Sequence, residues 1–390
     1  MIVSGYGQSE KTETSEAFRE AVLAARKAMS DGNPEVVILF ASGNHCEAIE
    51  AGLEAAVEVS GTDHVVGCSG MGVLSIEAEF EQRSAVVALA LGGDSIEAVP
   101  FLVPAEDAAL QLDTMLTPYA SEVGLLCVFP TISAGNPHEM IEQLSQTLSF
   151  PIVGAAASGA LASPGTTCQW LGTEHRTDGV SGVLLRGEFE TLTGVAQGCQ
   201  PFGQAYTITK AEGNVVYELA FTPAVDALKE ALDQLTPQQK ENVGPTIFAG
   251  IAMDEYDSER QRGDFLIRNL IGMNPDDGSI AIGEEVRVGQ TLQFNRRTAD
   301  AAHIDLTQTT SALREKLGDR QAAFGLYFNC LGRGFGLYGR PDHDVTAIRE
   351  EIGVLPLVGF FGNAEFAPVG GRNHVHSYTG GLVVFTELSD

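Results

Sequence analysis

The chain has 390 residues, 44% of them hydrophobic, and it carries 23 basic against 52 acidic side chains, for a net charge of −29. This length is too great for one ordinary core, so two domains are expected, and the apolar content is sufficient to bury both. A negative field of this size repels phosphate backbones and anionic lipid surfaces, which argues against nucleic acid or a membrane as partner.

The N-terminal stretch and the cysteines indicate a cellular compartment. The stretch MIVSGYGQSEKTETSE has neither the basic region nor the apolar core of a signal peptide, and no apolar run approaches the ~20 residues that cross a bilayer. The six cysteines are scattered without a C-x-x-C pair, which favours reduced thiols over a disulfide framework or a zinc site. We therefore expect a cytoplasmic protein that holds neither a metal nor another cofactor.

The first of three similar units spans about 15–91. Its central helix is indicated by Ile49, Leu53 and Val57, which share one helical face. The predicted elements are a helix at 15–29, a strand at 36–42, a helix at 46–59, the strand and glycine turn HVVGCSGMGVL at 64–74, and a strand at 84–91.

Two further units repeat this order, at about 106–187 and 307–387. They contain the related stretches PIVGAAASGAL (151–161) and PLVGFFGNAEF (356–366), each with V-G at the same place in the unit. Three such copies predict duplicated helix–strand–helix–strand–turn–strand units. Crossover helices give parallel strand pairs, and a last strand without a helix gives an antiparallel one. The predicted fold class is α/β with mixed α+β character, its mixed sheets flanked by helices.

Residues 188–300 break this pattern and are rich in strands. Turn signals stand at 212–214 and 276–279, and 223–240 is predicted to be a helix followed by a polar hinge. We place a domain boundary near residue 222. The predicted domains are 1–221, which contains the first two units, and 222–390, which contains the strand-rich insert and then the third unit.

The third unit carries the most specific motifs. FNCLGRG (328–334) contains C-x-G-R-G, and GFFGNAEFAP (359–368) contains G-x-x-G-x-x-E, ahead of NHVHSYTGGLVVF (373–385). Together with HVVGCSGMGVLS (64–75), these motifs resemble the N-terminal and C-terminal FIST domains, and the resemblance covers nearly the whole chain. It implies a sensory module of intracellular signal transduction that binds a small ligand, such as an amino acid or a related metabolite, and acts through a separate signalling output protein.

The strand ends of the third unit are the predicted ligand site, because ligands of open α/β sheets bind beyond the carboxyl ends of the strands. Arg333 would bind an anionic group and Glu365 an ammonium or hydroxyl group, a pairing that suits an amino acid. The alternative is that Arg333 pairs with Glu365 and holds two strand ends together. The predicted contacts are Asn329, Cys330, Gly332, Arg333, Gly334, Gly362, Asn363, Glu365, His374 and His376.

Equivalent strand ends in the first two units supply secondary candidates. Gly-Asn followed by a polar residue occurs in both units and is also ordinary helix-capping chemistry, so capping is the alternative to ligand binding. The secondary candidates are Cys68, Ser69, Asn44, His45, Asn136 and His138.

The stretch GRGFGLYG (332–339) contains a formal G-x-G-x-x-G. Polar residues separate it from the next predicted helix, which does not fit a dinucleotide-binding turn. Successive glycines between Arg333 and Arg340 better fit a nest of backbone N–H groups that binds an anion.

Other functions stay open at this point. Cys330 can be drawn as a nucleophile with Glu365 and His374, which would make the protein an enzyme acting on a small substrate. His374 and His376 lie on one face of an extended segment and could bind a transition metal only with a third ligand. The third alternative is a protein-interaction adaptor.

Overall fold

The computed structural model describes residues 1–30, 32–120, 123–132, 135–163, 165–241, 247–256 and 263–388. These residues form two compact units, each described separately here. The three-repeat unit comprises Met1–Val195 and Thr307–Asp390, and the barrel unit comprises Ala196–Leu306. The predicted boundary near residue 222 follows the order of the chain and falls within the barrel unit, whereas the compact units interleave along the sequence.

The three-repeat unit contains three copies of one motif, strand–helix–strand–helix–strand followed by a last strand. In each copy the strands lie side by side in the sheet in the order first, last, second, third strand of the motif. The second and third strands are parallel, and the last is antiparallel to the second. The predicted duplication and mixed sheets are therefore confirmed. The structure adds one leading strand to each predicted unit.

The elements of the three repeats are as follows. The first contains β1 (Val3–Ser9), α1 (Thr14–Ala28), β2 (Val36–Ser42), η1 (Gly43–Ala48), α2 (Ile49–Ser60), β3 (Val65–Gly70), β4 (Gly72–Ser75), β5 (Glu79–Glu81) and β6 (Val86–Gly92). The second contains β7 (Ile96–Pro104), α3 (Ala108–Leu116), η2 (Thr117–Tyr119), β8 (Gly124–Pro130), α4 (Pro137–Thr147), β9 (Ile152–Ala156), β10 (Gln169–Leu171), β11 (Glu174–Arg176) and β12 (Gly179–Gly187). The third contains β13 (Phe189–Ala196), α7 (Ala299–Leu317), β21 (Phe324–Cys330), α8 (Phe335–Tyr338), α9 (His343–Ile352), β22 (Leu357–Val369), β23 (Arg372–His376) and β24 (Gly380–Glu387).

The V-G signature of each repeat has a steric cause. Gly67, Gly154 and Gly359 occupy the third strand of their repeats, where the parallel neighbour runs very close. A Cβ atom at these positions would lie 1.7, 2.1 and 1.7 Å from a backbone oxygen of that neighbour. Only glycine allows such an approach, which explains why the pattern occurs three times.

The three repeats meet in one central core. Phe40 of β2, Phe129 of β8 and Phe328 of β21 have ring centroids 5.1 to 6.3 Å apart. Phe360 of β22 packs against all three, and all four side chains are buried. Each aromatic pair of this kind contributes about 0.5–1.5 kcal/mol beyond its burial. One strand of every repeat therefore contributes a ring to the same centre.

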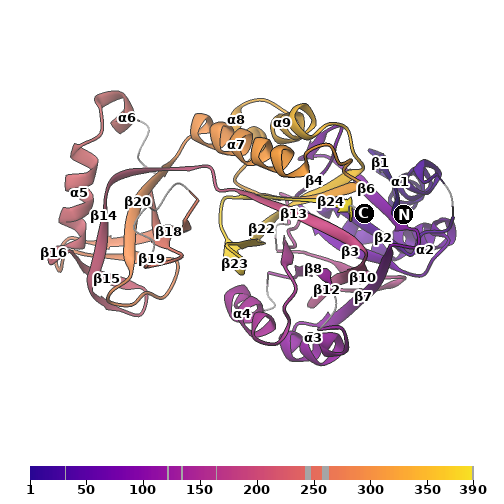
Figure 1. The fold of residues 1–390 in the computed structure, drawn as a ribbon, viewed down its shortest axis with the longest axis horizontal. Coiled ribbons are helices and arrows are strands. Elements are labelled where there is room, and N and C mark those ends of the chain that lie inside the picture. Colours follow the sequence, from indigo (N-terminus) through magenta and orange to yellow (C-terminus); the bar gives the residue numbers. More distant parts are fainter. Residues whose placement is uncertain are drawn as a thin grey trace. The chain divides into compact units, whose positions relative to one another are not determined.

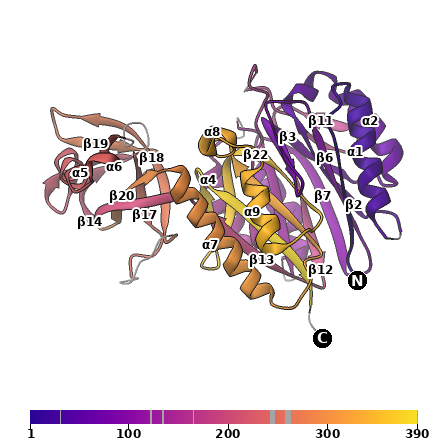
Figure 2. The same ribbon diagram turned by 90° about the horizontal axis from the view of Figure 1, so that it is seen from above.

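The helices cover the outer faces of the sheets. Figure 1 shows α1 with α2, α3 with α4, and α7 with α9 on three different sides of the three-repeat unit, and Figure 2 shows α1 and α2 outside β2 and β6. Each pair buries its apolar stripe over its own repeat in a separate cluster. The helices are amphipathic because only one side of each faces a sheet.

The barrel unit is a closed antiparallel barrel in the order β14–β20–β17–β18–β19–β15, in which β15 also pairs with β14. Phe294 packs with Phe202 and Tyr206 in its core. The predicted turns at 212–214 and 276–279 join β14 to β15 and β18 to β19. Its elements are β14 (Cys199–Glu212), β15 (Val215–Leu219), β16 (Thr222–Pro223), α5 (Ala224–Asp233), α6 (Pro237–Glu241), β17 (Ile247–Ala252), β18 (Phe265–Asn274), β19 (Ser279–Ile282) and β20 (Thr291–Arg297).

Two local expectations need correction. The glycine turn predicted within 356–366 is a continuous strand, β22, and a β-bulge at Ala364 (φ +53°) redirects its pairing. The stretch 332–339 was expected to be free of helix but contains the short helix α8. Trp170 lies on β10 opposite Gly67 and is fully buried.

Candidate functional site

The carboxyl end of β21 lies beside the middle of β22, the strand of the third repeat that carries the second motif. These strands are parallel, and Cys330 at the end of β21 is opposite Gly362. Asn329 is opposite Phe361 and is completely buried. The predicted contacts from the C-x-G-R-G and G-x-x-G-x-x-E motifs therefore share one edge of the sheet.

Arg333 forms a buried ion pair with Asp344, which lies in the first turn of α9. Its Nε donates to Asp344 Oδ2 at 2.9 Å, and both side chains are fully buried. Tyr327 Oη and Asn329 Nδ2 donate to the same carboxylate oxygen, at 2.9 and 3.2 Å. Burial raises the pKa of Asp344, but the Arg333 charge and His343 outweigh that effect and hold it below its usual range.

This pairing changes the role predicted for Arg333. It was expected to bind a ligand anion or, alternatively, Glu365, whereas its guanidinium contacts Asp344 and Tyr338 Oη inside the protein. The sequence analysis missed Asp344. An acidic residue in the first turn of a predicted helix is common enough that it carries little signal.

Glu79 reaches this network from the first repeat. Its Oε1 accepts hydrogen bonds from the backbone N–H groups of Asp344 and Val345, at 2.8 and 3.1 Å. Its own N–H donates to Asp342 Oδ1 at 2.7 Å. Burial, followed by the nearby Asp344 charge, raises the pKa of Glu79 to about 8. Sequence reasoning missed Glu79 also, although the E-F-E pattern of β5 is an unusual density of acids for a buried strand. We call Glu79, Tyr327, Asn329, Arg333 and Asp344 the Asp344 network.

The glycine-rich loop after β21 already holds an anion of the protein itself. Glu81 Oε1 accepts a hydrogen bond from the N–H of Phe335 at 2.8 Å. Gly334 has φ +65°, and a Cβ atom there would lie 2.4 Å from the Glu81 carboxylate. Glu81 thus occupies the part of the predicted anion nest next to Gly334 and Phe335, while Arg340 is exposed.

Glu365 is completely buried at the bulged part of β22. Its Oε2 accepts hydrogen bonds from Thr379 N and Thr379 Oγ1, at 3.1 and 2.9 Å, and the thiol of Cys330 also bonds to this carboxyl group. Burial raises the pKa of Glu365 to about 7. Among the described residues, Glu365 Oε1 has no hydrogen-bond partner. Cys330 and Glu365, two of the predicted contacts, therefore lie next to each other, whereas Arg333 pairs with Asp344.

His374 and His376 lie on β23, the strand that pairs with the part of β22 that contains Glu365. His376 is opposite Glu365 in the β22–β23 register and bonds to the Ala367 carbonyl oxygen through Nε2 at 3.0 Å. The two imidazole rings are 6.1 Å apart. Within the described ranges, no group of three His, Cys, Asp or Glu side chains has the arrangement of a metal site.

The secondary candidates of the first two repeats serve mainly as caps and core residues. His45 Nδ1 bonds to Thr14 Oγ1 at 3.0 Å, and burial lowers its pKa. Asn136 caps α4 by accepting from the N–H of His138 at 3.0 Å. Other members pair nearby: Asn44 donates to Ser84, Ser69 donates to the carbonyl of Ser158, and Cys68 is completely buried.

A cavity of about 120 Å³ lies at the carboxyl ends of β8 and β9, beside the start of α4. Asn363 and Ala364 of the β22 bulge close it from the third repeat. Its wall is mostly apolar, and Thr131 and Asn363 supply a hydroxyl and an amide. The lining residues are Pro130, Thr131, Ile132, Gly135, Pro137, Met140, Ala156, Asn363 and Ala364.

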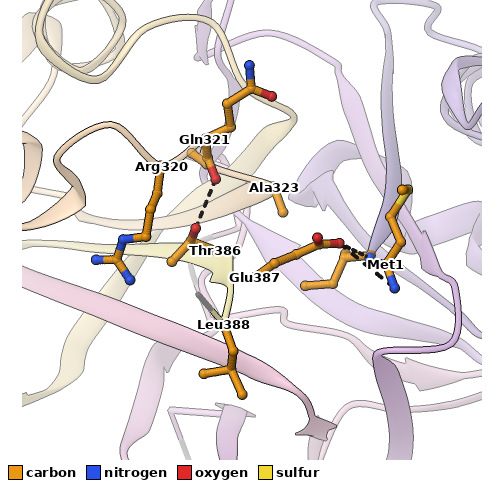
Figure 3. A pocket seen from close by; sticks show the side chains of 9 residues that line it. Met1, Arg320, Gln321, Ala323, Thr386, Glu387 and Leu388 are labelled. Atoms are coloured by element: carbon orange, nitrogen blue, oxygen red, sulfur yellow. Dashed lines mark hydrogen bonds and ion pairs between the residues drawn. The ribbon is translucent and has the colours of Figure 1, made fainter. Parts of the chain in front are cut away.

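A larger hollow of about 440 Å³ lies at the opposite, amino end of β21, where β1 begins and β24 ends (Figure 3). Its polar groups bond to one another: Thr386 Oγ1 donates to the Gln321 carbonyl oxygen at 2.9 Å, and the Met1 amino group pairs with Glu387 at 4.0 Å. Arg320 forms an ion pair with Glu190. None of the predicted site residues lines this hollow.

Comparison with known proteins agrees with the motifs. A FIST N domain model matches residues 35–220, and a FIST C domain model matches residues 224–368. An uncharacterized protein of Mycobacterium tuberculosis strain H37Rv is 33% identical over 388 residues, which cover 98% of this chain and 99% of that protein. An uncharacterized protein of Mycobacterium bovis is 32% identical over 385 residues, covering 98% of each.

A solved structure, that of cyanuric acid hydrolase from A. caulinodans, aligns over 100% of both chains with a TM-score of 0.37 and 9% identity. A likeness at this level supports no inference about the fold or the activity. Across the described residues, no helix is long and apolar enough to span a membrane. The family models and the relatives, which cover almost the whole sequence, show that the chain belongs to the FIST family, whose domains are associated with sensing in signal transduction.

Proposed function

We propose that this protein is a sensor that binds one small metabolite in the cavity between the second and third repeats. The observation that carries the proposal is this cavity of about 120 Å³ at the carboxyl ends of two parallel strands, with a mostly apolar wall and two polar groups. Such strand ends are where ligands of α/β sheets bind. FIST domains are also thought to bind small ligands in signalling.

The lining favours a small aliphatic amino acid or a metabolite of similar size and polarity. Ile132, Met140 and Ala156 offer an apolar surface to a short aliphatic group, and Asn363 offers an amide to its polar end. The Thr131 hydroxyl bonds to Thr167 Oγ1 at 2.9 Å and adds only its remaining hydrogen-bonding capacity. A volume of about 120 Å³ holds only a few water-sized groups, which limits the ligand to few non-hydrogen atoms. In this proposal the cavity, and not Arg333, contacts the polar end of the ligand, because Arg333 is buried against Asp344.

The cavity is next to the other predicted contacts. Glu365 follows Ala364 directly in β22, and its buried Oε1 carries no hydrogen bond within the described part of the chain. A ligand that displaces the Ala364 bulge would alter the position of Glu365 and thereby its bonds to Cys330 and Thr379. We propose that this step transmits occupancy to a separate output protein, in the cytoplasm.

A thermal-shift screen of amino acids and related metabolites tests the proposal. We expect a small aliphatic amino acid to raise the melting temperature, by an amount that grows with its concentration. Asn363→Ala should abolish this rise. Asn44→Ala is the matched control, since Asn44 is an exposed strand-end asparagine of the first repeat, outside the cavity, and should leave the rise unchanged. The proposal fails if no compound shifts the transition, or if Asn363→Ala binds as the parent does.

The enzyme alternative makes a different prediction at Cys330. Its sulfur is buried and lies beside the Glu365 carboxyl group, which disfavours a second negative charge on a thiolate. We therefore expect iodoacetamide to alkylate Cys330 slowly near neutral pH. Rapid alkylation at this one residue would favour catalysis instead. No observation favours the adaptor alternative, and a pull-down with the full chain would test it.

A further inference from the structure

Two cysteines that the proposed ligand site does not use meet at the strand ends of the first repeat. Cys46 lies in η1, immediately after β2, and Cys168 immediately precedes β10. The Cys168 segment is held against β3, because Ser69 N donates to the Cys168 carbonyl oxygen at 2.9 Å and Cys168 N donates to Ser69 Oγ at 3.0 Å. Residues far apart in the sequence are thus fixed as neighbours.

The two thiols lie within hydrogen-bonding reach of each other. Cys46 is partly exposed to solvent, whereas Cys168 is buried, with an exposed fraction of 2%. Both pack in the outer core of the first repeat, close to Trp170. A reagent from solvent can therefore reach Cys46 first, and Cys168 lies directly behind it.

The surroundings shift the pKa values of the two thiols in opposite directions. Contacts with the Cys168 thiol, the Ser69 hydroxyl and the Cys168 backbone together lower the pKa of Cys46 despite its burial. The same contact, together with burial, raises the pKa of Cys168. Cys46 is accordingly the sulfur that loses its proton, and thiolates are the reactive form of cysteine.

We propose that Cys46 and Cys168 form a dithiol that reacts with hydroperoxides and closes to an intramolecular disulfide. The Cys46 thiolate attacks one peroxide oxygen, the O–O bond breaks, and the leaving oxygen takes a proton to form water or an alcohol. Cys46 is now a sulfenic acid. Cys168 attacks the Cys46 sulfur, the S–O bond breaks, and the hydroxide that leaves takes the Cys168 proton as water. Two thiols are oxidised by two electrons and one hydroperoxide is reduced.

The other cysteines provide internal controls. Cys68 is adjacent on β3 but completely buried, and burial raises its pKa well above the usual value. Cys127 is completely buried as well, and burial raises its pKa. The proposal therefore singles out Cys46 for attack and Cys168 for closure.

Oxidation of the full chain with hydrogen peroxide, followed by N-ethylmaleimide and mass spectrometry, tests this. We expect a loss of two hydrogens per molecule, a Cys46–Cys168 cross-linked peptide, and full reversal by dithiothreitol. Cys168→Ser should stop at the sulfenic acid, which dimedone labels on Cys46. Cys46→Ser should form no disulfide, and the control Cys68→Ser should form it as the parent does.

Peroxide oxidation of the parent protein tests the proposal even if a variant fails to fold. The proposal is overturned if peroxide leaves Cys46 and Cys168 free to react with N-ethylmaleimide, or if the disulfide joins a different pair. It is equally overturned if Cys46 is oxidised past the sulfenic acid while Cys168 is still a thiol. Loss of ligand binding in the cavity variants would not affect these outcomes, so the two proposals fail independently.

Discussion

In the second and third repeats, the space at the end of the second strand lies next to the first turn of the following helix. Different groups occupy this space in the two repeats. In the third repeat, the backbone N–H groups in the first turn of α9 donate to the carboxyl group of Glu79, which belongs to the first repeat. In the second repeat, the first turn of α4 is capped by its own Asn136. The space next to that turn is the cavity closed by Asn363 and Ala364. One strand end is therefore filled by the protein, and the equivalent one is open to a ligand.

Under the proposed function, stability depends on one strand end of the duplicated fold and ligand binding on the equivalent one. Buried charges such as Arg333 and Asp344 are tolerated only when each partner is present, so the third strand end has little freedom to change. An apolar cavity wall imposes no such requirement. We expect the two sites to respond very differently to substitution.

The largest effect is expected from Arg333→Met. It leaves the Asp344 carboxylate buried without its charge partner, which typically costs about 3–5 kcal/mol of unfolding free energy. Urea unfolding followed by the fluorescence of Trp170, the only tryptophan, measures the three-repeat unit. Arg340→Met, in the same loop but exposed, is the control and should change stability by less than about 0.5 kcal/mol. Equal effects of the two substitutions would contradict a structural role for the ion pair.

Glu79 makes the filled strand end sensitive to pH. Its pKa is raised to about 8 in the folded protein, so between pH 4.5 and 8 the folded chain holds a proton that the unfolded chain has lost. The free energy of unfolding should therefore fall as the pH rises through this window, by about 1.4 kcal/mol per pH unit. Glu79→Gln keeps the acceptor oxygen and should remove most of that slope in urea titrations at several pH values. An unchanged slope would rule out Glu79 as its source.

Ala364 tests the strain stored at the cavity. Its φ of +53° costs an alanine about 1 kcal/mol, so Ala364→Gly should raise the unfolding free energy by up to that amount. Ala367→Gly is the matched control in the same strand. Ala367 is buried and is not among the positive-φ residues, so the change should lower stability. If both variants lose stability, the bulge is not strained.

The smallest effect on stability is expected for Asn363→Ala. Asn363 lines the cavity, so removing its amide should change the unfolding free energy by less than about 0.5 kcal/mol. The same variant should lose the ligand-induced rise in melting temperature. A loss of several kcal/mol would instead place Asn363 with the Asp344 network as a structural residue.

The duplication was predictable because its signals are local. Helical spacing such as Ile49, Leu53 and Val57 lies within one element. The V-G pairs that mark Gly67, Gly154 and Gly359 follow from the contact between adjacent parallel strands, which recurs in each copy. The leading strands were not assigned to the predicted units: β13 lies in the strand-rich stretch that follows residue 187, and β1 and β7 precede the first predicted helix of their units.

The site was predictable only in part. Cys330 and Glu365, two of the predicted contacts, lie next to each other because β21 and β22 are the parallel strands of one βαβ unit and Cys330 is opposite Gly362. Glu79 was missed because its partner Asp344 is 265 residues away and belongs to another repeat. The cavity was missed because Thr131 and Asn363, from the second and third repeats, form it jointly.

The sequence by itself determined the repeated motif, the mixed sheets and the family, because periodicity, glycine positions and short motifs are properties of neighbouring residues. Only the tertiary structure decided that the strand end of the third repeat is occupied by Glu79, whereas the strand ends of the second repeat border a cavity. That choice depends on side chains from one repeat entering another: Glu79 reaches α9, whereas the Ala364 bulge stops short and leaves a space. Contacts of this kind depend on how the three copies close around their common core, and no local pattern encodes that.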